Sequence, residues 1–499
     1  MDEIRGLVDH LESRSRIIRN PSYSWLKAHA SKYAIKNDFG IPLFHSRVCA
    51  RMPDATIDDV NKVSGDVKAH ILAEINELKK YIMGKTFIAV DRAVGISRGF
   101  RVKVRAYVSS RYPHLALMFA VNYFQPSDDD DYEIVTIDIP EWPRKLVLVD
   151  PVERATVILG SDYYGELKMS ALRMAMNYAR DYMGLLGVHA ATKVYYVHGG
   201  RPEGEGFLIF GLSGTGKSTI TFHLHEGDLR DDERVAIRQD DINIVNRRAH
   251  AYATEENFYP KTDSAPSIPN LMKALHHQDT ILENVAVKNG VLDFRDTSGC
   301  HSNARAIAIR HAIEGADLEY DTERVTKIIF LTRRHDMPVA ARVSSIEQAT
   351  AYFMLGESIK TSAGTMDPRE VGKPVRVPGF DPFIIGPKWL NGLRFYEILY
   401  NNPDIQVYVL NTGYIGNTKI TPQYTLKTVL AIARGDAVED FDENLNMYRI
   451  VSVPGLDLGK LDPYKHIPGY AEHIKRIRDE RANYLASKFK PISFISYSI

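Results

Sequence analysis

A glycine-rich loop near the middle of the chain constrains the fold more than any other feature. Residues 211–218 read GLSGTGKS, which matches the phosphate-loop pattern G-x-x-x-x-G-K-[ST]. The apolar run FLIF at 207–210 precedes the loop, and residues 219–224 can continue as a helix, so the order strand, loop, helix is the one that the pattern requires. Backbone N–H groups of such a loop surround phosphate oxygens, while Lys217 reaches the β- and γ-phosphates and Ser218 holds a divalent metal. The loop therefore predicts binding of a nucleoside triphosphate.

A pair of aspartates follows the loop in the sequence. Asp240 and Asp241 stand between two apolar runs, at 235–237 and 242–245. Two carboxylates in a strand-like segment are unfavourable unless they face a cation. A strand-borne aspartate commonly completes the Mg²⁺ site of phosphate-loop enzymes, so we expect this pair to contribute to metal binding.

Composition narrows the class of protein further. The 499 residues carry 63 Lys+Arg against 63 Asp+Glu, and this balance argues against a general nucleic-acid binder or a protein that binds acidic membranes. The start of the chain lacks the pattern of a secretory signal, and no apolar run is long enough for a transmembrane helix. The chain has only two cysteines, Cys49 and Cys300, which are too few for a disulfide framework or a four-thiolate zinc site. Cys300 is expected to be a thiol near the predicted nucleotide site.

These observations together predict a cytoplasmic protein that acts on a small molecule and binds neither nucleic acid nor a membrane. They do not indicate the oligomeric state.

Hydrophobic patterns predict a mixed α/β chain. Helices are expected at 55–83 and 172–186, and strands at 86–90, 102–108, 115–124, 146–149, 156–159 and 193–198. The acidic run at 127–131 is interpreted as a solvated loop. A change in character near Gly187 suggests a domain boundary there, and length alone favours two domains.

Several motifs resemble those of the ATP-dependent phosphoenolpyruvate carboxykinase family. The loop with its next residue, GLSGTGKST at 211–219, is close to the GLSGTGKTT of that family. The other similar stretches follow in the order of the family: GELK at 165–168, MNY at 176–178, VHA at 188–190, DD at 240–241, LENV at 282–285, DFRD at 293–296, SNAR at 302–305, KIIFLT at 327–332, SAGT at 362–365 and VLNTGY at 409–414.

The resemblance implies a fold, an activity and cofactors. It implies a two-domain α/β (mixed α+β) fold, with a substrate-side domain at residues 1–186 and a nucleotide-binding domain at 187–499, and an active site in the cleft between them. The implied reaction converts oxaloacetate and ATP into phosphoenolpyruvate, ADP and CO₂, with Mg²⁺ and Mn²⁺ as metals.

The resemblance also assigns residues. Positions similar to the nucleotide contacts of the family are Gly211, Ser213, Gly214, Thr215, Gly216, Lys217, Ser218 and Thr219, with Lys419 and Thr425 toward the adenine. Positions similar to its metal ligands are His189 and Asp241. Ser218 of the phosphate loop is expected to be a further metal ligand. Positions expected to act in catalysis are Lys217, Arg305, Asp240 and Lys261, with Arg47, Tyr163 and Arg305 next to the substrate.

One departure from the family keeps other functions open. Met169 stands where the family has a lysine that binds the metal, and a thioether is a poor ligand for a hard cation. Lys193, four residues after His189, would lie on the same face of a strand and offers another amine. Alternatives are a kinase that phosphorylates a hydroxyl of another small molecule, with His189 or Asp240 as the base, and a nucleotide-binding regulatory protein without turnover.

Overall fold

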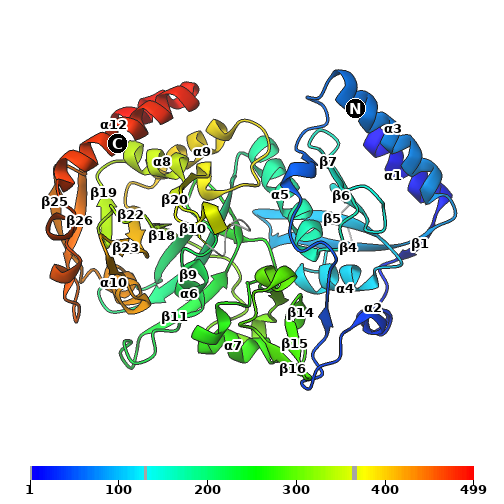
Figure 1. Cartoon of the computed structure of the whole chain (residues 1–499), viewed down its shortest axis with the longest axis horizontal. Helices are drawn as coiled ribbons and strands as arrows, with labels where there is room; N and C mark the ends of the chain where they lie inside the picture. Colours follow the sequence, from blue (N-terminus) through cyan, green and yellow to red (C-terminus); the bar gives the residue numbers. More distant parts are fainter. Residues whose placement is uncertain (1–2, 128–131, 362–367) are drawn as a thin grey trace. The chain divides into compact units, whose positions relative to one another are not determined.

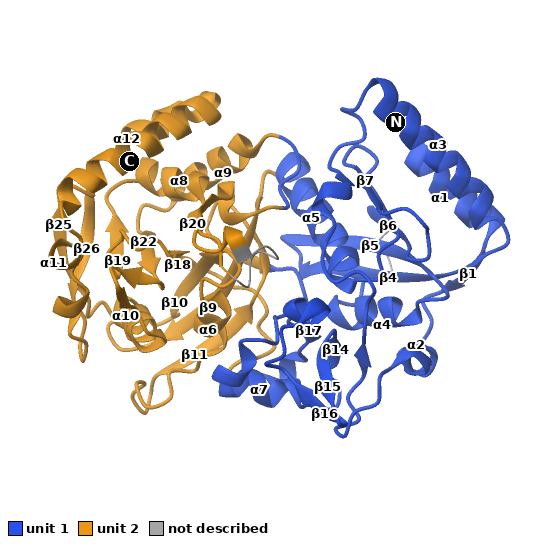
Figure 2. Cartoon of the chain, in the orientation of Figure 1, with its two compact units in different colours: residues 1–183, 253–313, 383–386 blue, residues 184–252, 314–382, 387–499 orange. Residues whose placement is uncertain are grey.

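The computed structural model describes residues 3–127, 132–361 and 368–499 (Figure 1). The chain divides into two compact units (Figure 2). Unit 1 comprises residues 1–183, 253–313 and 383–386, and unit 2 comprises residues 184–252, 314–382 and 387–499. The single boundary that we placed near Gly187 is close to the first of these divisions. Segment 253–313 belongs to unit 1, however, so Lys261 and Arg305 are not part of the unit that carries the phosphate loop.

Unit 1 is built on a mixed seven-stranded sheet. Its strand order is β1-β4-β5-β6-β8-β7-β3, with bounds Arg16–Arg19, Thr86–Ser97, Phe100–Ser109, Ile134–Ile139, Ala155–Leu159, Leu146–Asp150 and Thr56–Ile57. The helices of this unit are α1 (Glu3–Arg14), α2 (Tyr23–Ala30), α3 (Gly65–Ile82), α4 (Pro113–Asn122), α5 (Tyr164–Tyr182) and α7 (Pro269–Leu275). Helices α1 and α3 share one hydrophobic cluster with residues of β4, β6 and β8, because their apolar side chains recur every three or four residues. Helices α4 and α5 contact the same sheet.

Smaller strands in unit 1 carry residues of interest. Strands β17 (Arg305–Ile307), β14 (Ile281–Glu283) and β2 (Leu43–Phe44) form a three-stranded sheet. Strands β15 (Ala286–Lys288) and β16 (Val291–Asp293) form a hairpin.

Unit 2 is built on a larger mixed sheet with helices on both faces. Its strand order is β13-β12-β9-β10-β18-β22-β19-β26-β25, with β11 also paired to β9. The bounds, in that order, are Ala251–Ala253, Ile242–Val245, Leu186–Tyr196, Glu205–Gly211, Val325–Thr332, Gln406–Asn411, Ala340–Val343, Met447–Ser452, Val438–Asp442 and, for β11, Arg234–Gln239. The helices are α6 (Lys217–Phe222), α8 (Ile346–Leu355), α9 (Lys388–Asn401), α10 (Pro422–Arg434), α11 (Pro463–His466) and α12 (Tyr470–Lys488). Strand β20 (Glu357–Ile359) pairs antiparallel with β21 (Pro374–Arg376), and β23 (Tyr414–Ile415) pairs antiparallel with β24 (Thr418–Lys419).

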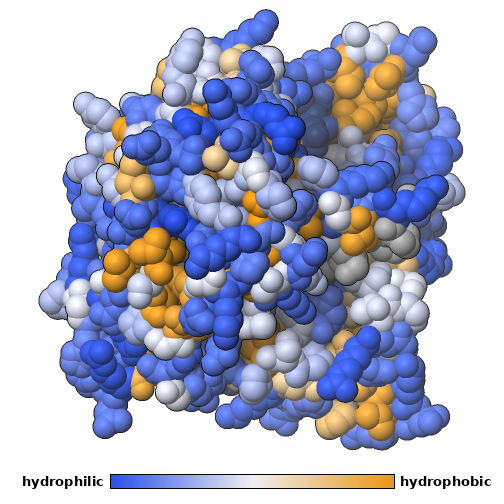
Figure 3. Space-filling model, turned by 60° about the vertical axis from the view of Figure 1, so that its left-hand side comes forward, coloured by the Kyte–Doolittle hydropathy of each residue, from blue (hydrophilic) through white to orange (hydrophobic). Residues whose placement is uncertain are grey.

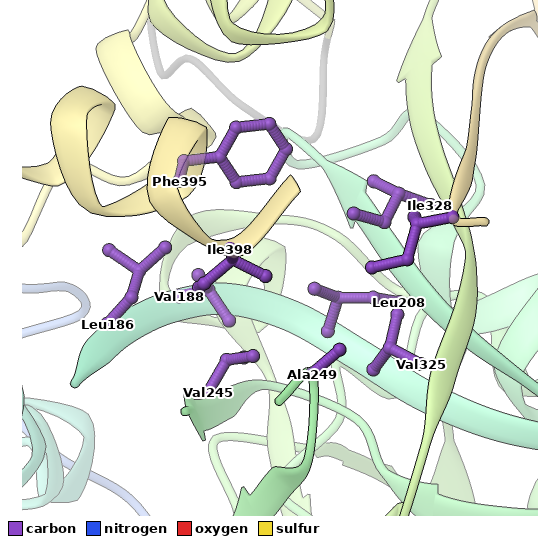
Figure 4. A pocket seen from close by; sticks show the side chains of 10 residues that line it. Leu186, Val188, Leu208, Val245, Ala249, Val325, Ile328, Phe395 and Ile398 are labelled. Carbon is purple, nitrogen blue, oxygen red and sulfur yellow. The ribbon is translucent and has the colours of Figure 1, made fainter. Parts of the chain in front are cut away.

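Side chains alternate along β10 between the two faces of this sheet, and each face has its own hydrophobic core. Leu208 and Phe210 pack with residues of α8, α9 and α12, whereas Phe207 and Ile209 pack with residues of α6 and α10. The first of these cores encloses a cavity of about 10 Å³, which is lined only by apolar side chains from the sheet, α9 and adjoining loops (Figure 4). A cavity of this size and polarity is a packing gap and not a ligand site.

The mixed α/β class is confirmed, and one predicted element is wrong. Residues 115–124 were expected to form a strand, but most of them belong to helix α4. Almost every residue of α4 is buried, so its sequence shows no polar face and cannot be told from a buried strand by periodicity. The predicted helix at 55–83 begins only at Gly65. The runs at 128–131 and 362–365 lie outside the described residues.

One face of the molecule shows how polar and apolar side chains are distributed. The face in Figure 3 is mostly hydrophilic, and its apolar side chains form separate groups. Within the described part of the chain, no helix combines the length and apolar character that a membrane span requires.

Candidate active site

The phosphate loop lies in unit 2 between strand β10 and helix α6. Gly214 and Gly216 have φ angles of 79° and 97°, a region that other residues rarely adopt. A Cβ atom at Gly214 would also lie 2.3 Å from the side-chain oxygen of Thr361. Both glycines are therefore required by the shape of the loop; Gly216 is the second fixed glycine of the motif, and Gly214 stands at a position that the motif leaves open.

Three side chains from other elements fix the carbonyl groups of this loop. The hydroxyl of Thr361 donates to the carbonyl of Ser213, and that of Thr412 donates to the carbonyl of Thr215, each at 2.7 Å. Arg333 donates to the carbonyl of Gly214 at 3.0 Å. Sequence reasoning missed these supports, although Thr412 lies within the stretch at 409–414 that resembles the family. They hold the loop in one shape before any phosphate binds.

Strand register brings His189 and Asp241 together. His189 of β9 pairs with Ile242, the first residue of β12, and Asp241 directly precedes that residue. The Nε2 atom of His189 consequently lies 3.0 Å from Oδ1 of Asp241. The same carboxylate oxygen lies 3.6 Å from the Nζ atom of Lys217. Asp241 is thus close both to His189, the other predicted metal ligand on these strands, and to the lysine of the phosphate loop.

The hydrogen bonding of His189 fits a cation at this position. Its Nδ1 atom lies 3.0 Å from the carbonyl oxygen of Phe380, which can only accept, so Nδ1 carries a hydrogen. In a neutral imidazole the lone pair is then on Nε2, where it faces the carboxylate of Asp241. Two acceptors at 3.0 Å need a proton or a metal ion between them. A neutral imidazole whose other nitrogen donates to a carbonyl is the usual form of a metal-bound histidine. The pair of His189 and Asp241 fits a divalent cation, and the Ser218 hydroxyl stays a predicted ligand.

Lys193 has a different environment from the one that we considered. It is buried, and its Nζ atom donates to the carbonyl of Ile220 at 2.9 Å and also to the carbonyl of His223. Burial lowers the pKa of Lys193 to about 7. The amine therefore binds carbonyl groups at the end of helix α6, the helix that follows the phosphate loop.

The other predicted residues of unit 2 lie on several elements. Asp240 is buried next to Asp241. Lys419 is exposed on the β23–β24 hairpin, and Thr425 is buried in helix α10. Their contacts with a nucleotide stay predictions.

Unit 1 holds a second group of predicted residues around Arg305. Arg305 donates from Nε to Oδ1 of Asn303 at 3.3 Å, and Asn303 donates from Nδ2 to the hydroxyl of Tyr163 at 2.8 Å. Lys261 pairs with Arg305 across a backbone bridge. Burial and then the charge of Arg305 lower the pKa of Lys261 to about 8. The structure thus brings together Arg305, Tyr163 and Lys261, and their roles in catalysis and substrate binding stay predictions.

Two buried residues behind Arg305 were not singled out as site residues from the sequence. Glu283 of β14 faces Arg305 of β17 in register, and it accepts hydrogen bonds from the hydroxyl of Tyr259 and, at 2.7 Å, from the backbone N–H of Tyr164. Burial raises the pKa of Glu283 to about 7. The guanidinium carbon of Arg305 lies 5.6 Å from the centre of the Tyr259 ring. Glu283 belongs to the LENV stretch at 282–285, which is the signal that could have found it.

Arg47 is held by an acidic partner in unit 1. Its Nε atom donates to Oδ2 of Asp162 at 2.9 Å, and its Nη2 atom donates to the hydroxyl of Tyr112 at 2.9 Å. The side chain is 65% exposed, so the guanidinium is oriented and still accessible to an anion. Its role with a substrate carboxylate stays a prediction.

The two cysteines form a disulfide, which contradicts the expectation of a free thiol at Cys300. The Cys49–Cys300 bond joins the segment that carries Arg47 to helix η4 (Gly299–Asn303), which precedes Arg305. Asn303 also donates to the carbonyl of Cys49 at 3.0 Å. The cysteines lie 251 positions apart in the sequence, so spacing gave no indication that they meet.

Met169 and its neighbour Lys168 are both buried in helix α5. The Nζ atom of Lys168 lies 3.1 Å from Oε2 of Glu255, in an ion pair whose two side chains are each about 1% exposed. Lys168, the lysine of the GELK stretch, therefore has its ion-pair partner, Glu255, within unit 1.

Unit 2 therefore combines a strand, a glycine loop, the lysine of that loop and an adjoining His–Asp pair, the features of a phosphate-loop protein. Comparison with known proteins gives the family. Residues 56–457 match the model of the phosphoenolpyruvate carboxykinase family. The chain is also 39% identical over 504 residues to a protein of Aeropyrum pernix named phosphoenolpyruvate carboxykinase (ATP), a match that covers 99% of each chain. The protein belongs to the ATP-dependent phosphoenolpyruvate carboxykinase family, whose enzymes use ATP and a divalent metal.

Proposed function

We propose that the protein is a phosphoenolpyruvate carboxykinase that converts oxaloacetate and ATP into phosphoenolpyruvate, ADP and CO₂. Family membership supports this reaction. The observation that carries the proposal is the position of Asp241, within 3.0 Å of His189 and 3.6 Å of Lys217. A metal site next to a phosphate-loop lysine is the arrangement that phosphoryl transfer from a nucleotide requires.

Residues of unit 2 are proposed to hold the nucleotide. Backbone N–H groups of the loop at 211–219 and the ammonium of Lys217 bind phosphate oxygens and take up the charge that develops during transfer. His189, Asp241 and Ser218 would hold a divalent metal, which supplies charge neutralisation at the phosphate oxygens. Lys419 and Thr425 are proposed to lie toward the adenine.

Residues of unit 1 are proposed to hold the second substrate. Arg47 and Arg305 bind its carboxylates, since a planar guanidinium matches a carboxylate with two hydrogen bonds. Asn303 and Asp162 orient these two arginines through the bonds described above. Loss of CO₂ leaves an enolate, whose oxygen attacks the γ-phosphorus, and little proton transfer is needed. The cytoplasm is the proposed location.

Product identity tests the proposal. The protein is incubated with ATP, Mg²⁺ and Mn²⁺, and with either oxaloacetate or a mixture of hydroxylated metabolites, and the products are followed by phosphorus NMR. We expect phosphoenolpyruvate from oxaloacetate. A phosphomonoester formed only from the mixture would instead identify a small-molecule kinase, and nucleotide binding without any turnover would identify a regulatory protein.

A further inference from the structure

Three side chains outside the proposed active site form a compact group in unit 1. His277 and Asp279 lie in the loop after helix α7, and His311 lies in the short helix η5 (Arg310–Ala312). One nitrogen from each histidine and one carboxylate oxygen all lie within 4.8 Å of one another. The proposed function uses none of the three.

The distances within this group approach those around a bound metal. Oδ2 of Asp279 lies 3.8 Å from Nδ1 of His277 and 4.0 Å from Nε2 of His311. Ligand atoms about 2.0–2.2 Å from a tetrahedral Zn²⁺ ion lie about 3.3–3.6 Å apart. The ligand atoms of this group lie somewhat farther apart than that, so the side chains must close inward when an ion binds.

The side-chain types in this group suit a metal ion. The backbone N–H of Asp279 donates to Nδ1 of His277 at 3.3 Å, a long hydrogen bond that an ion at this nitrogen would replace. The two imidazole rings are nearly perpendicular, with centres 5.0 Å apart. Two imidazoles and one carboxylate suit zinc and its neighbours in the first transition row.

Both segments are held firmly by other bonds. The hydroxyl of Thr280 donates to the carbonyl of Ala274 at 2.7 Å, which fixes the loop after α7. The backbone N–H of Arg310 donates to Asn257 at 2.8 Å, and its side chain donates to the carbonyl of Glu256 at 2.9 Å, which fixes η5. A site on such supports loses little freedom when it binds an ion.

We propose that His277, Asp279 and His311 bind a divalent transition-metal ion of the zinc type, with water at the open positions. The ion would tie the loop after α7 to η5, within the segment 253–313 that also carries Lys261 and Arg305. This role is structural and is independent of the proposed reaction.

Metal titration tests the inference. Metal-free protein is titrated with Zn²⁺ by calorimetry and with Co²⁺ by visible absorption, whose d–d bands report coordination by nitrogen and oxygen. The active-site ligands His189 and Asp241 remain in every variant, so the new site appears as an additional equivalent. The variants are His311→Ala, whose side chain is 65% exposed in the parent, and Asp279→Asn, which keeps the shape of the carboxylate.

We expect each variant to lose one equivalent of Zn²⁺, or to bind it at least tenfold more weakly, and to lose the corresponding Co²⁺ bands. The control His70→Ala changes an exposed histidine on α3 and should bind as the parent does. Equal stoichiometry and equal affinity in the parent, His311→Ala and Asp279→Asn would overturn the proposal. Circular dichroism confirms that each variant is folded before titration.

Discussion

Removal of the Cys49–Cys300 disulfide should destabilise unit 1 by an amount set by the length of chain that it closes. With 251 positions between the cysteines, the chain-entropy relation gives an upper value of about 5.5 kcal/mol at 25 °C. Residual structure in the unfolded chain reduces this figure, and native disulfides typically contribute about 2–5 kcal/mol. At about 2 °C per kcal/mol for a unit of this size, the melting temperature should fall by about 4–10 °C.

The assay compares the parent protein with the double variant Cys49→Ser/Cys300→Ser by calorimetry, each with and without a reductant. Reductant should lower the melting temperature of the parent to that of the variant, and should leave the variant unchanged. A thiol titration of the denatured parent should find no free thiol before reduction and two after it. Two free thiols before reduction, or equal melting temperatures of parent and variant, would refute the reasoning.

Three further predictions concern titratable or charged side chains. Glu357→Gln should destabilise unit 2 by about 3–5 kcal/mol in denaturant unfolding, because it leaves the buried Arg481, 2.5 Å from Glu357, without its anion; an unchanged midpoint would contradict this. Arg305→Lys should lower kcat for oxaloacetate by about 100-fold, because an ammonium cannot reproduce the planar contacts of the guanidinium; an unchanged kcat would contradict the role of Arg305. Glu283 has a pKa raised to about 7, so the folded state keeps a proton that the unfolded state loses above pH about 4.5. The free energy of unfolding should therefore fall by about 3 kcal/mol as the pH rises from about 4.5 to about 7. Glu283→Gln should abolish that dependence, and a stability difference between parent and variant that does not vary from pH 5 to pH 8 would count against it.

Features that depend on local sequence could be predicted. The phosphate loop was identified because its residue types each meet a local requirement, since Gly214 and Gly216 adopt positive φ angles and Lys217 stands at the start of α6. The flanking strand and helix have the expected order, and a central strand that is buried on both faces reads as a continuous apolar run.

Features that depend on distant pairing could not be predicted from the residues alone. Helix α4 was mistaken for a strand because burial on every side removes the helical periodicity. The contact of Glu283 with Tyr259 and its position beside Arg305 depend on the pairing of β14 with β17. The proximity of His189 and Asp241 similarly results from the register of β9 with β12, and only the order of the family motifs suggested it.

The stoichiometry of turnover tests the central claim most directly. The parent and Lys217→Ala are each supplied with oxaloacetate, ATP, Mg²⁺ and Mn²⁺, and phosphoenolpyruvate, ADP and CO₂ are measured in the same time course after subtraction of spontaneous decarboxylation. We predict that the parent forms the three products in equal amounts and that Lys217→Ala forms none of them above background while it keeps its fold. Release of CO₂ without consumption of ATP, ADP formation without phosphoenolpyruvate, or full activity of Lys217→Ala would contradict the account.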